Sequence, residues 1–495
     1  MCALPDVPGA GMRPELRPCS GPASEVCSRP RGAMTQRLTG GDGGRGTQGQ
    51  SLRARPWCGK ASMLYPLLFG PLYFLSVAMA IPATPSLVNT LLSGDNKVTG
   101  AGQMKLGSLL ATDAFFTLLT TNVWATMSDK YGRQPFIAMS AAGIGVGAAI
   151  VAYSSSLARV LGVSPFTCMY VAAAIDGCTS CMFGLGQAYV CDVSDTPLLP
   201  ANIGLFMGVS AGLGFTFGVP FSAVLMKRQG VRRPFEISAG LALLNTLLAL
   251  AIVPESLPPA AARVRISWRE CNPLAALATL ARNRLLAGAS LSYFLLWFAH
   301  TGLQVTWMNF FAKAHGWSAG KSGGVLAVFG IATAILPRLL LRFMPLTTAL
   351  QGGLWVYAIA MLALSQARAD GQVYAALCIA AIGSTSLPSS LSFLANQASF
   401  DAQGAMQGAT ETLKTINSVL AQQIMSAVFA FGLSDTGRAP GLVFLVGSAL
   451  LAASAAVLSF TLARFSHLDA SRPQPAADAP GDSRRSVHAG SDLQL

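Results

Sequence analysis

A short charged turn, Ser128-Asp129-Lys130-Tyr131-Gly132-Arg133-Gln134-Pro135, separates two apolar stretches of the chain, residues 106–127 and 136–154. Each stretch has about the 20 residues that a helix needs to cross a hydrocarbon core about 30 Å thick. The glycine allows a tight reversal of direction. The carboxylate can pair with an arginine or cap the start of a neighbouring helix. The stretch therefore predicts two membrane-spanning helices joined at one membrane surface.

The apolar pattern continues on both sides of this turn. Hydrophobic residues make up 52% of the 495-residue chain and charged residues 11%, against about 25% charged in a typical soluble domain. In lipid, backbone polar groups must be satisfied within their own segment, so an all-α membrane protein is expected. Twelve transmembrane helices are predicted at 63–83, 106–127, 136–154, 168–189, 202–225, 234–253, 285–311, 321–342, 346–366, 373–395, 408–431 and 440–464.

A basic, proline-containing loop divides these spans into two six-helix bundles. The net charge of +13 fits basic tails and loops at a membrane surface better than nucleic-acid binding. Both tails are too polar to bury a core, and Met34 and Met63 are alternative starts. The predicted parts are a disordered basic N-terminal tail (1–60), an N-terminal six-helix bundle (61–255), a cytoplasmic central loop (256–284), a C-terminal six-helix bundle (285–465) and a disordered C-terminal tail (466–495).

The turn quoted above resembles the signature loop of the major facilitator superfamily. Asp129, Gly132 and Arg133 match the loop's pattern, whereas Ala125 replaces its leading glycine and Gln134 its final basic residue. In that family the loop is cytoplasmic and latches the two halves in the outward-open state. The resemblance therefore implies that both tails lie in the cytoplasm, and it assigns Asp129, Gly132 and Arg133 to a conformational latch.

Other segments resemble the drug- and tetracycline-antiporter branch of this superfamily. They are Gln187-Ala188-Tyr189-Val190-Cys191-Asp192, Pro254-Glu255-Ser256, Asn272-Pro273-Leu274, Arg282-Asn283-Arg284 and Gln403-Gly404-Ala405-Met406-Gln407-Gly408. The fifth predicted span resembles the branch's antiporter motif through Gly208, Gly212, Gly214, Gly218 and Pro220. Small residues at this spacing are equally typical of close helix packing, and both interpretations stay open.

The resemblance implies secondary transport of a small organic solute by alternating access, with proton coupling expected. Two departures weaken the case for antiport. Val219 separates the last glycine of the motif from its proline, and Ala173 stands where proton-coupled relatives carry an arginine. A facilitative uniporter and a transporter-like receptor or scaffold without transport are the alternatives.

Four ionisable residues lie inside predicted spans: Asp113, Asp176, Glu411 and Lys414. A charge at mid-bilayer costs at least about 2.5–3.5 kcal/mol, so such groups face water, pair with one another or carry protons. Asp176, about 12 Å deep in its span, is the leading candidate for binding a proton or a cationic solute. Glu411 and Lys414 can pair on one helix face. A purely structural ion pair is the competing interpretation for each of them.

Polar residues follow helical spacing on predicted spans 2, 4, 7, 10 and 11, and spans 3, 6, 9 and 12 carry few of them. Span 7 presents Tyr293, Trp297, His300 and Gln304. A histidine can relay protons near neutral pH, and aromatic rings can bind organic cations. A polar stripe of this kind faces either a cavity or another helix. Substrate or proton binding and ordinary packing both stay open for these four residues.

The sequence carries no catalytic, metal-binding or cofactor-binding motif. Cys178 and Cys181 share a helix face but lack a second Cys or His pair. No phosphate-binding loop is present. We therefore expect no enzyme activity, no metal and no cofactor. The expected partners are a small-molecule solute, protons and the lipid bilayer, without nucleic acid, and the protein is expected to be a monomer in a membrane of unknown identity.

Overall fold

The computed structural model describes residues 61–94, 97–194, 199–257, 273–397, 403–434 and 439–465. These residues form sixteen helices and no strand, and all of the helices belong to one compact unit, Arg55–Leu495. Both predicted tails and most of the predicted central loop lie outside the described residues. Their disorder and the exact part boundaries therefore stay predictions.

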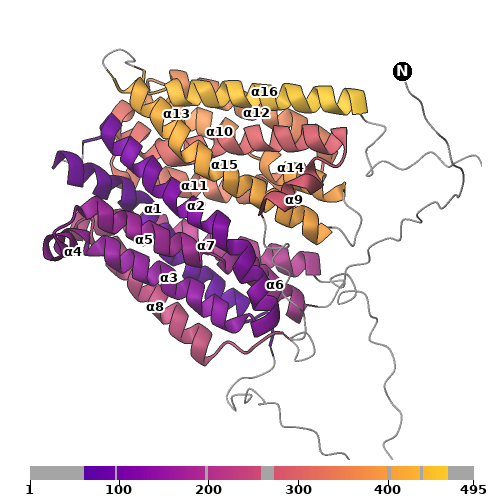
Figure 1. Ribbon diagram of the computed structural model, residues 1–495. Coiled ribbons are helices and arrows are strands. Elements are labelled where there is room, and N and C mark those ends of the chain that lie inside the picture. The colour runs from indigo at the N-terminus through magenta and orange to yellow at the C-terminus, as the bar shows by residue number, and fades with distance from the viewer. Residues whose placement is uncertain are drawn as a thin grey trace, which may run out of the picture. The chain divides into compact units, whose positions relative to one another are not determined.

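The first half of the described chain contains helices α1 to α8, drawn in indigo to magenta in Figure 1. Their bounds are α1 (Pro66–Ser93), α2 (Gly100–Tyr131), α3 (Gln134–Ala152), α4 (Ser154–Leu161), α5 (Pro165–Thr179), α6 (Met182–Val193), α7 (Leu199–Gln229) and α8 (Arg233–Ala251). Helix α4 is a short addition after α3, and α5 and α6 together occupy the fourth predicted span.

The second half contains helices α9 to α16, which end in yellow in Figure 1. Their bounds are α9 (Pro273–Leu280), α10 (Arg284–His315), α11 (Ala319–Leu340), α12 (Leu346–Gln366), α13 (Asp370–Gly383), α14 (Ser386–Asn396), α15 (Gln403–Gly432) and α16 (Leu442–Phe465). Helix α9 is short and precedes the seventh predicted span, and α13 and α14 together occupy the tenth.

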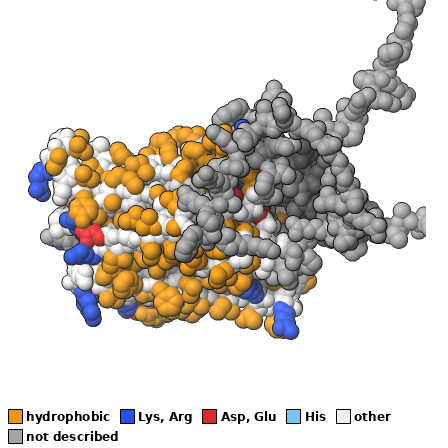
Figure 2. All heavy atoms as spheres, turned by 90° about the horizontal axis from the view of Figure 1, so that it is seen from below, with side chains coloured by type: hydrophobic (Ala, Val, Ile, Leu, Met, Phe, Trp, Pro, Cys, Tyr) orange, Lys and Arg blue, Asp and Glu red, His pale blue; other side chains and the backbone are white. Residues whose placement is uncertain are grey.

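Nine segments among the described residues are long and apolar enough to cross a membrane: α1, α3, α5 with α6, α7, α8, α11, α12, α13 with α14, and α16. The other three long helices, α2, α10 and α15, have 32, 32 and 30 residues but are more polar. Together these segments coincide with the twelve predicted spans. On the face shown in Figure 2, hydrophobic side chains cover the surface and Lys and Arg side chains lie toward its two ends.

The two halves meet chiefly through the helix pairs α2 with α15 and α7 with α11, and α10 also contacts α1 and α2. Within the first half, α1 packs closely on α7. A Cβ at Gly214 would lie 2.6 Å from the Cβ of Phe74, and one at Gly218 would lie 2.7 Å from the Cβ of Ala78. Close packing therefore accounts for these two glycines of the predicted antiporter motif.

The rest of that motif has no such explanation. A Cβ at Gly208 or Gly212 would meet nothing within 4 Å, and Pro220 lies inside α7. A role for these three residues in transport stays a prediction.

Two predicted spans are broken near the middle, and a serine cluster in the sequence marks only the second of these breaks, in span 10. Ser180 and Cys181 interrupt the fourth span between α5 and α6, and Ser384 and Thr385 interrupt the tenth between α13 and α14. The two breaks occupy corresponding places in the two halves, as expected for internal repeats. Non-helical backbone at this depth requires other hydrogen-bond partners.

In the first half, neighbouring helices supply those partners. Trp124 of α2 donates to the Cys178 carbonyl near the end of α5 at 2.6 Å. The Thr120 hydroxyl is shared between the Phe116 carbonyl of its own helix, at 2.9 Å, and the Gly177 carbonyl of α5, at 3.3 Å. The Ser140 hydroxyl of α3 accepts from two backbone N–H groups at the start of α6, at 3.3 and 3.2 Å. Polar side chains of α2 and α3 therefore supply hydrogen-bond partners for the backbone groups at the break between α5 and α6.

Candidate functional site

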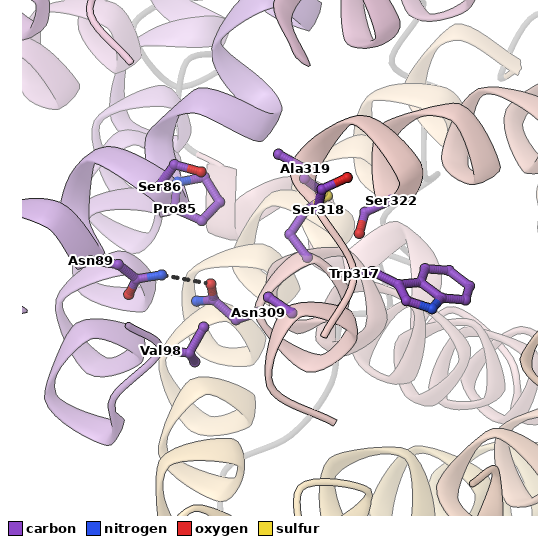
Figure 3. Close-up of a pocket in the computed structure, with 11 residues that line it drawn as sticks. Pro85, Ser86, Asn89, Val98, Asn309, Trp317, Ser318, Ala319 and Ser322 are labelled. Carbon is purple, nitrogen blue, oxygen red and sulfur yellow. Dashed lines mark hydrogen bonds between the residues drawn. The ribbon is translucent and has the colours of Figure 1, made fainter. Parts of the chain in front are cut away.

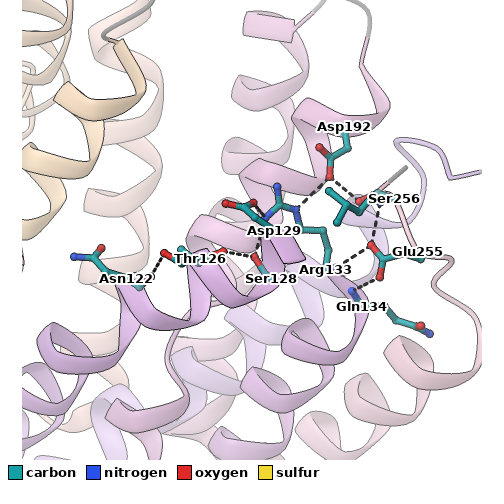
Figure 4. A network of polar contacts seen from close by, with 11 residues as sticks. Asn122, Thr126, Ser128, Asp129, Arg133, Gln134, Asp192, Glu255 and Ser256 are labelled. Carbon is teal, nitrogen blue, oxygen red and sulfur yellow. Dashed lines mark hydrogen bonds and ion pairs between the residues drawn. The ribbon is translucent and has the colours of Figure 1, made fainter. Parts of the chain in front are cut away.

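The turn between α2 and α3 lies in a charged network, which we define as Asp129, Arg133, Asp192 and Glu255 (Figure 4). Arg133 is buried. Its guanidinium pairs with Asp129, four residues earlier, and its Nε lies 3.3 Å from Oδ2 of Asp192 on α6. Its Nη1 donates to the Ser128 hydroxyl at 2.7 Å. One arginine thus ties the end of α2 to the end of α6.

Glu255, which follows α8, caps the start of α3. Its carboxylate accepts hydrogen bonds from the backbone N–H groups of Arg133 and Gln134, at 2.8 and 3.1 Å. A negative charge stabilises a helix N-terminus. Gly132 leaves room for this cap, because its φ is 102° and a Cβ there would lie 2.3 Å from Glu255 Oε2. Of the two roles open to Asp129, the structure shows the arginine pair, and Glu255 provides the cap.

Gln134, which departs from the family pattern, has a structural role of its own. Its side-chain amide donates to the carbonyl groups of Ala249 and Leu250 near the end of α8, at 3.0 and 3.2 Å. A neutral amide suits this position, because a helix C-terminus leaves carbonyl groups without intrahelical partners. The replacement therefore fastens α3 to α8.

The charged network lies within the first half. Among the described residues, the partners of Asp129 and Arg133 come from α2, α6 and the segment after α8. Arg338 of α11 lies at the same end of the helices, 3.5 Å from the place of a Cβ at Gly204, near the start of α7. We call this end the loop end. A latch between the halves stays a prediction.

A neutral network crosses between the halves at the opposite end of the helices. We define this amide network as Asn89 of α1, Gln103 of α2, Asn309 of α10 and Ser426 of α15, all of them buried. Asn89 donates to Asn309 at 3.0 Å (Figure 3), and Asn309 donates to Gln103 at 2.7 Å. Gln103 donates to the Ser426 hydroxyl at 3.0 Å and to the Val305 carbonyl at 3.1 Å.

No member of the amide network is among the residues predicted from the sequence. Ser426 stands one helical turn after Gln422 on span 11, but nothing in the sequence indicates which residues of the other spans it would meet. A polar residue inside a membrane span is by itself a weak signal for a contact.

A small polar pocket of about 110 Å³ adjoins the amide network, between α1 and the start of α11 (Figure 3). Ser86, Asn89, Asn309 and Ser322 are among its lining residues. The Asn89 Oδ1 and Ser322 Oγ atoms are buried without a hydrogen-bond partner in the described part of the chain. An unpaired buried polar group costs about 1–3 kcal/mol, so we expect water in this pocket. The pocket is lined by residues of both halves.

The four predicted residues of span 7 gather along α10. The ring of Trp297 lies 6.1 Å from that of Tyr293 and 5.4 Å from that of His300, centroid to centroid. Tyr293 and His300 are buried, whereas Gln304 is exposed in the middle of its helix. A polar side chain exposed at this depth faces water rather than lipid. Tyr293 is thus a buried member of this group and Gln304 its exposed polar member, and a role of either residue in binding stays a prediction.

The predicted pair on α15 is present, with Lys414 Nζ 3.4 Å from Glu411 Oε2. The Lys414 ammonium also lies 4.6 Å from the ring centroid of Trp297 and 5.8 Å from that of Phe183. Because Phe183 belongs to α6, Lys414 reaches the space between the halves. We call Trp297, Gln304, Glu411 and Lys414 the second-half wall.

Asp113 of α2 and Asp176 of α5 lie on two neighbouring helices of the first half, and we call them the acidic pair. The two helices are in close contact here, since a Cβ at Gly177 would lie 2.3 Å from the carbonyl oxygen of Asp113. Both aspartates remain partly exposed. Within the described ranges, neither carboxylate has an ion-pair or hydrogen-bond partner. The structural ion pair considered for Asp176 therefore has no visible partner.

The chain has relatives of known family. The Major Facilitator Superfamily profile matches residues 68–422. The class C tetracycline resistance protein of Escherichia coli is 25% identical over 382 residues, covering 76% of this chain and 91% of that protein. The structure of the human organic anion transporter MFSD10 has a TM-score of 0.59 at 18% identity, covering 80% and 99% of the two chains. A D-xylose-proton symporter has a TM-score of 0.60 at 15% identity, covering 79% and 96%.

Proposed function

Because the chain belongs to the major facilitator superfamily, we propose that it exchanges a small organic solute for protons by alternating access. It is a multi-pass integral membrane protein that resembles the tetracycline-proton antiporter branch, and a transporter rather than an enzyme. We propose the coupling to protons, the class of solute and the roles of single residues.

The acidic pair is the observation that carries proton coupling. Two neighbouring carboxylates repel each other unless a proton or a cationic group of the solute lies between them. A carboxylate in an alternating cavity can be ionised when it is open to one side and protonated when it is open to the other. Asp176 is assigned the coupled proton, and Asp113 is the neighbour whose charge makes its release depend on the state of the cavity.

The two ends of the helices support alternating access. The amide network joins the halves at one end, whereas the charged network at the loop end stays in the first half. The halves are therefore bonded together at the end opposite the loop. If the loop end faces the cytoplasm, as the signature loop implies, this conformation is closed on the outer side.

Flux in proteoliposomes tests the proposal, with tetracycline as the first probe because a relative is named for resistance to it. We expect Asp176→Asn to abolish accumulation driven by a pH gradient. Exchange down the solute gradient should survive, because the amide has the shape of the protonated acid. Glu236→Gln is the control, since Glu236 pairs with Arg232 and Arg233 at the start of α8 and both fluxes should stay native.

Other outcomes of this experiment separate the alternatives. A parallel fall of both fluxes in Asp176→Asn would assign this carboxylate to a cationic solute, since a lost charge-assisted contact weakens binding in every mode. Native flux that ignores the pH gradient would favour a uniporter, which the alanine at position 173 already suggests. Binding of the solute without flux would favour a receptor or scaffold.

A further inference from the structure

Three side chains lead from the interior of the second half to the second-half wall. Tyr357 of α12 is 0% exposed, and its hydroxyl lies 2.8 Å from Nδ1 of His300. Nε2 of His300 lies 3.1 Å from the side-chain nitrogen Nε2 of Gln304, one helical turn further along α10, and a turn of the amide places its oxygen there instead. In the described part of the chain, the Tyr357 hydroxyl has no other partner. The three groups form one hydrogen-bonded chain that ends at an exposed amide.

The positions of the hydrogens follow from what each group can donate. A neutral imidazole has one N–H donor and one acceptor nitrogen. If Nδ1 of His300 carried the hydrogen, Tyr357 would accept it, and the buried tyrosine O–H would lack an acceptor, which is costly. If Nε2 carries the hydrogen, Tyr357 donates to Nδ1 and Nε2 donates to the amide oxygen of Gln304. The Tyr357 hydroxyl and both ring nitrogens of His300 then each have a hydrogen-bond partner.

The second arrangement determines which amide atom of Gln304 faces the space between the halves. The oxygen and nitrogen of a glutamine amide have nearly the same outline, so hydrogen bonding decides their placement. With the oxygen turned to His300, the NH2 group points away from it. Gln304 lies seven residues after Trp297 and therefore on the same helix face.

We propose that Tyr357, acting through His300, holds the Gln304 NH2 group toward the space between the halves, where it binds a hydrogen-bond acceptor of the transported solute. This inference rests on the proposed transport function and adds the solute chemistry. The Lys414 ammonium supplies further donors on the same wall, and the Trp297 ring offers a flat face for stacking. The wall fits a planar organic solute with a carbonyl or carboxylate oxygen.

The tautomer of His300 tests the positioning without any solute. The full-length protein is labelled with 15N-histidine in lipid nanodiscs, and His300→Gln identifies the His300 signal among four histidines. We expect the hydrogen on Nε2, and we expect Tyr357→Phe to shift the population toward Nδ1. Tyr189→Phe, which removes an equally buried hydroxyl in the first half, should leave the signal unchanged. A hydrogen on Nδ1 in the native protein would overturn the proposal, because Gln304 would then present its oxygen.

Tetracycline, a fused-ring solute with several carbonyl oxygens, tests the recognition. Gln304→Glu replaces the NH2 donor with a carboxylate oxygen and is expected to weaken tetracycline binding about tenfold. Tyr357→Phe should raise KM about threefold at unchanged kcat, whereas a merely structural role would lower kcat and thermal stability together. Equal affinity of native protein and Gln304→Glu, or no binding by the native protein, would overturn the assigned solute chemistry. Failure of pH-driven accumulation alone would count against proton coupling and leave this inference standing.

Discussion

At the loop end Arg133 binds carboxylates within one half, whereas at the opposite end Gln103 and Asn309 bind across the two halves. A buried charged pair is strongly destabilised when one partner is lost. A neutral hydrogen bond contributes only about 0.5–1.5 kcal/mol net. Under the proposed alternating access, the contacts that break and re-form are therefore the weak ones, and the strong contacts hold the first half together.

The largest effect is expected from Arg133→Ala, which removes the centre of the charged network. Asp192 would keep a partly buried carboxylate without its arginine, so we expect a loss of about 2–3 kcal/mol of stability. Thermal unfolding in detergent measures this loss. The control is Arg342→Ala, since Arg342 is an exposed arginine at the corresponding loop of the second half. Equal unfolding temperatures for the two variants would show that the network does not hold the first half together.

A conformational effect is expected from Asn309→Ala, which removes two hydrogen bonds between the halves. We expect a shift of about tenfold toward the state that is open at the amide end. Spin labels on Arg159→Cys and Lys313→Cys, in a background without other cysteines, report the distance between the halves. Ser448→Ala is the control, because its hydroxyl bonds within the second half. An unchanged distance distribution would mean that other contacts close this end.

A smaller loss of stability is expected from Gly132→Ala, because a side chain is strained at a φ of 102°. We expect about 1–2 kcal/mol. Because the new Cβ also disturbs the cap formed by Glu255, Gly132→Ala and Glu255→Gln should together cost less than their sum. Gly240→Ala is the control, since a Cβ there meets nothing within 4 Å. If the two losses of stability simply add, Gly132 does not act through the cap formed by Glu255.

The smallest effect on stability is expected from Asp129→Asn. The Asp129 side chain is 52% exposed, and an exposed ion pair contributes at most about 1 kcal/mol. We nevertheless expect slower transport with near-normal expression, because the family's latch uses this charge in only one conformation. Rates of tetracycline exchange beside unfolding temperatures measure the two effects. Native turnover would leave the loop with the role of a turn alone.

The polar stripes show how far a pattern in the sequence reaches. Helical spacing places Thr120 on the polar stripe of span 2 and Gln304 on that of span 7, and it predicts that both face a cavity or another helix. Spacing does not separate the two cases. Thr120 bonds to a carbonyl group at the break between α5 and α6, whereas Gln304 stays exposed. Tyr357 lies on span 9, which carries few polar residues, so nothing in the sequence indicates its hydrogen bond to His300.

The length and apolarity of the spans and the signature turn could be read from the sequence directly, because hydrophobic length and local spacing belong to neighbouring residues. The partners of the polar groups could not. Gln103 and Ser426 are 323 positions apart, and Glu255 reaches a backbone N–H 122 positions away. Which buried amide meets which depends on how helices pack, and only folding brings such distant residues within hydrogen-bond distance. Tertiary structure therefore decided which polar residues join the halves, which cap a helix and which face water.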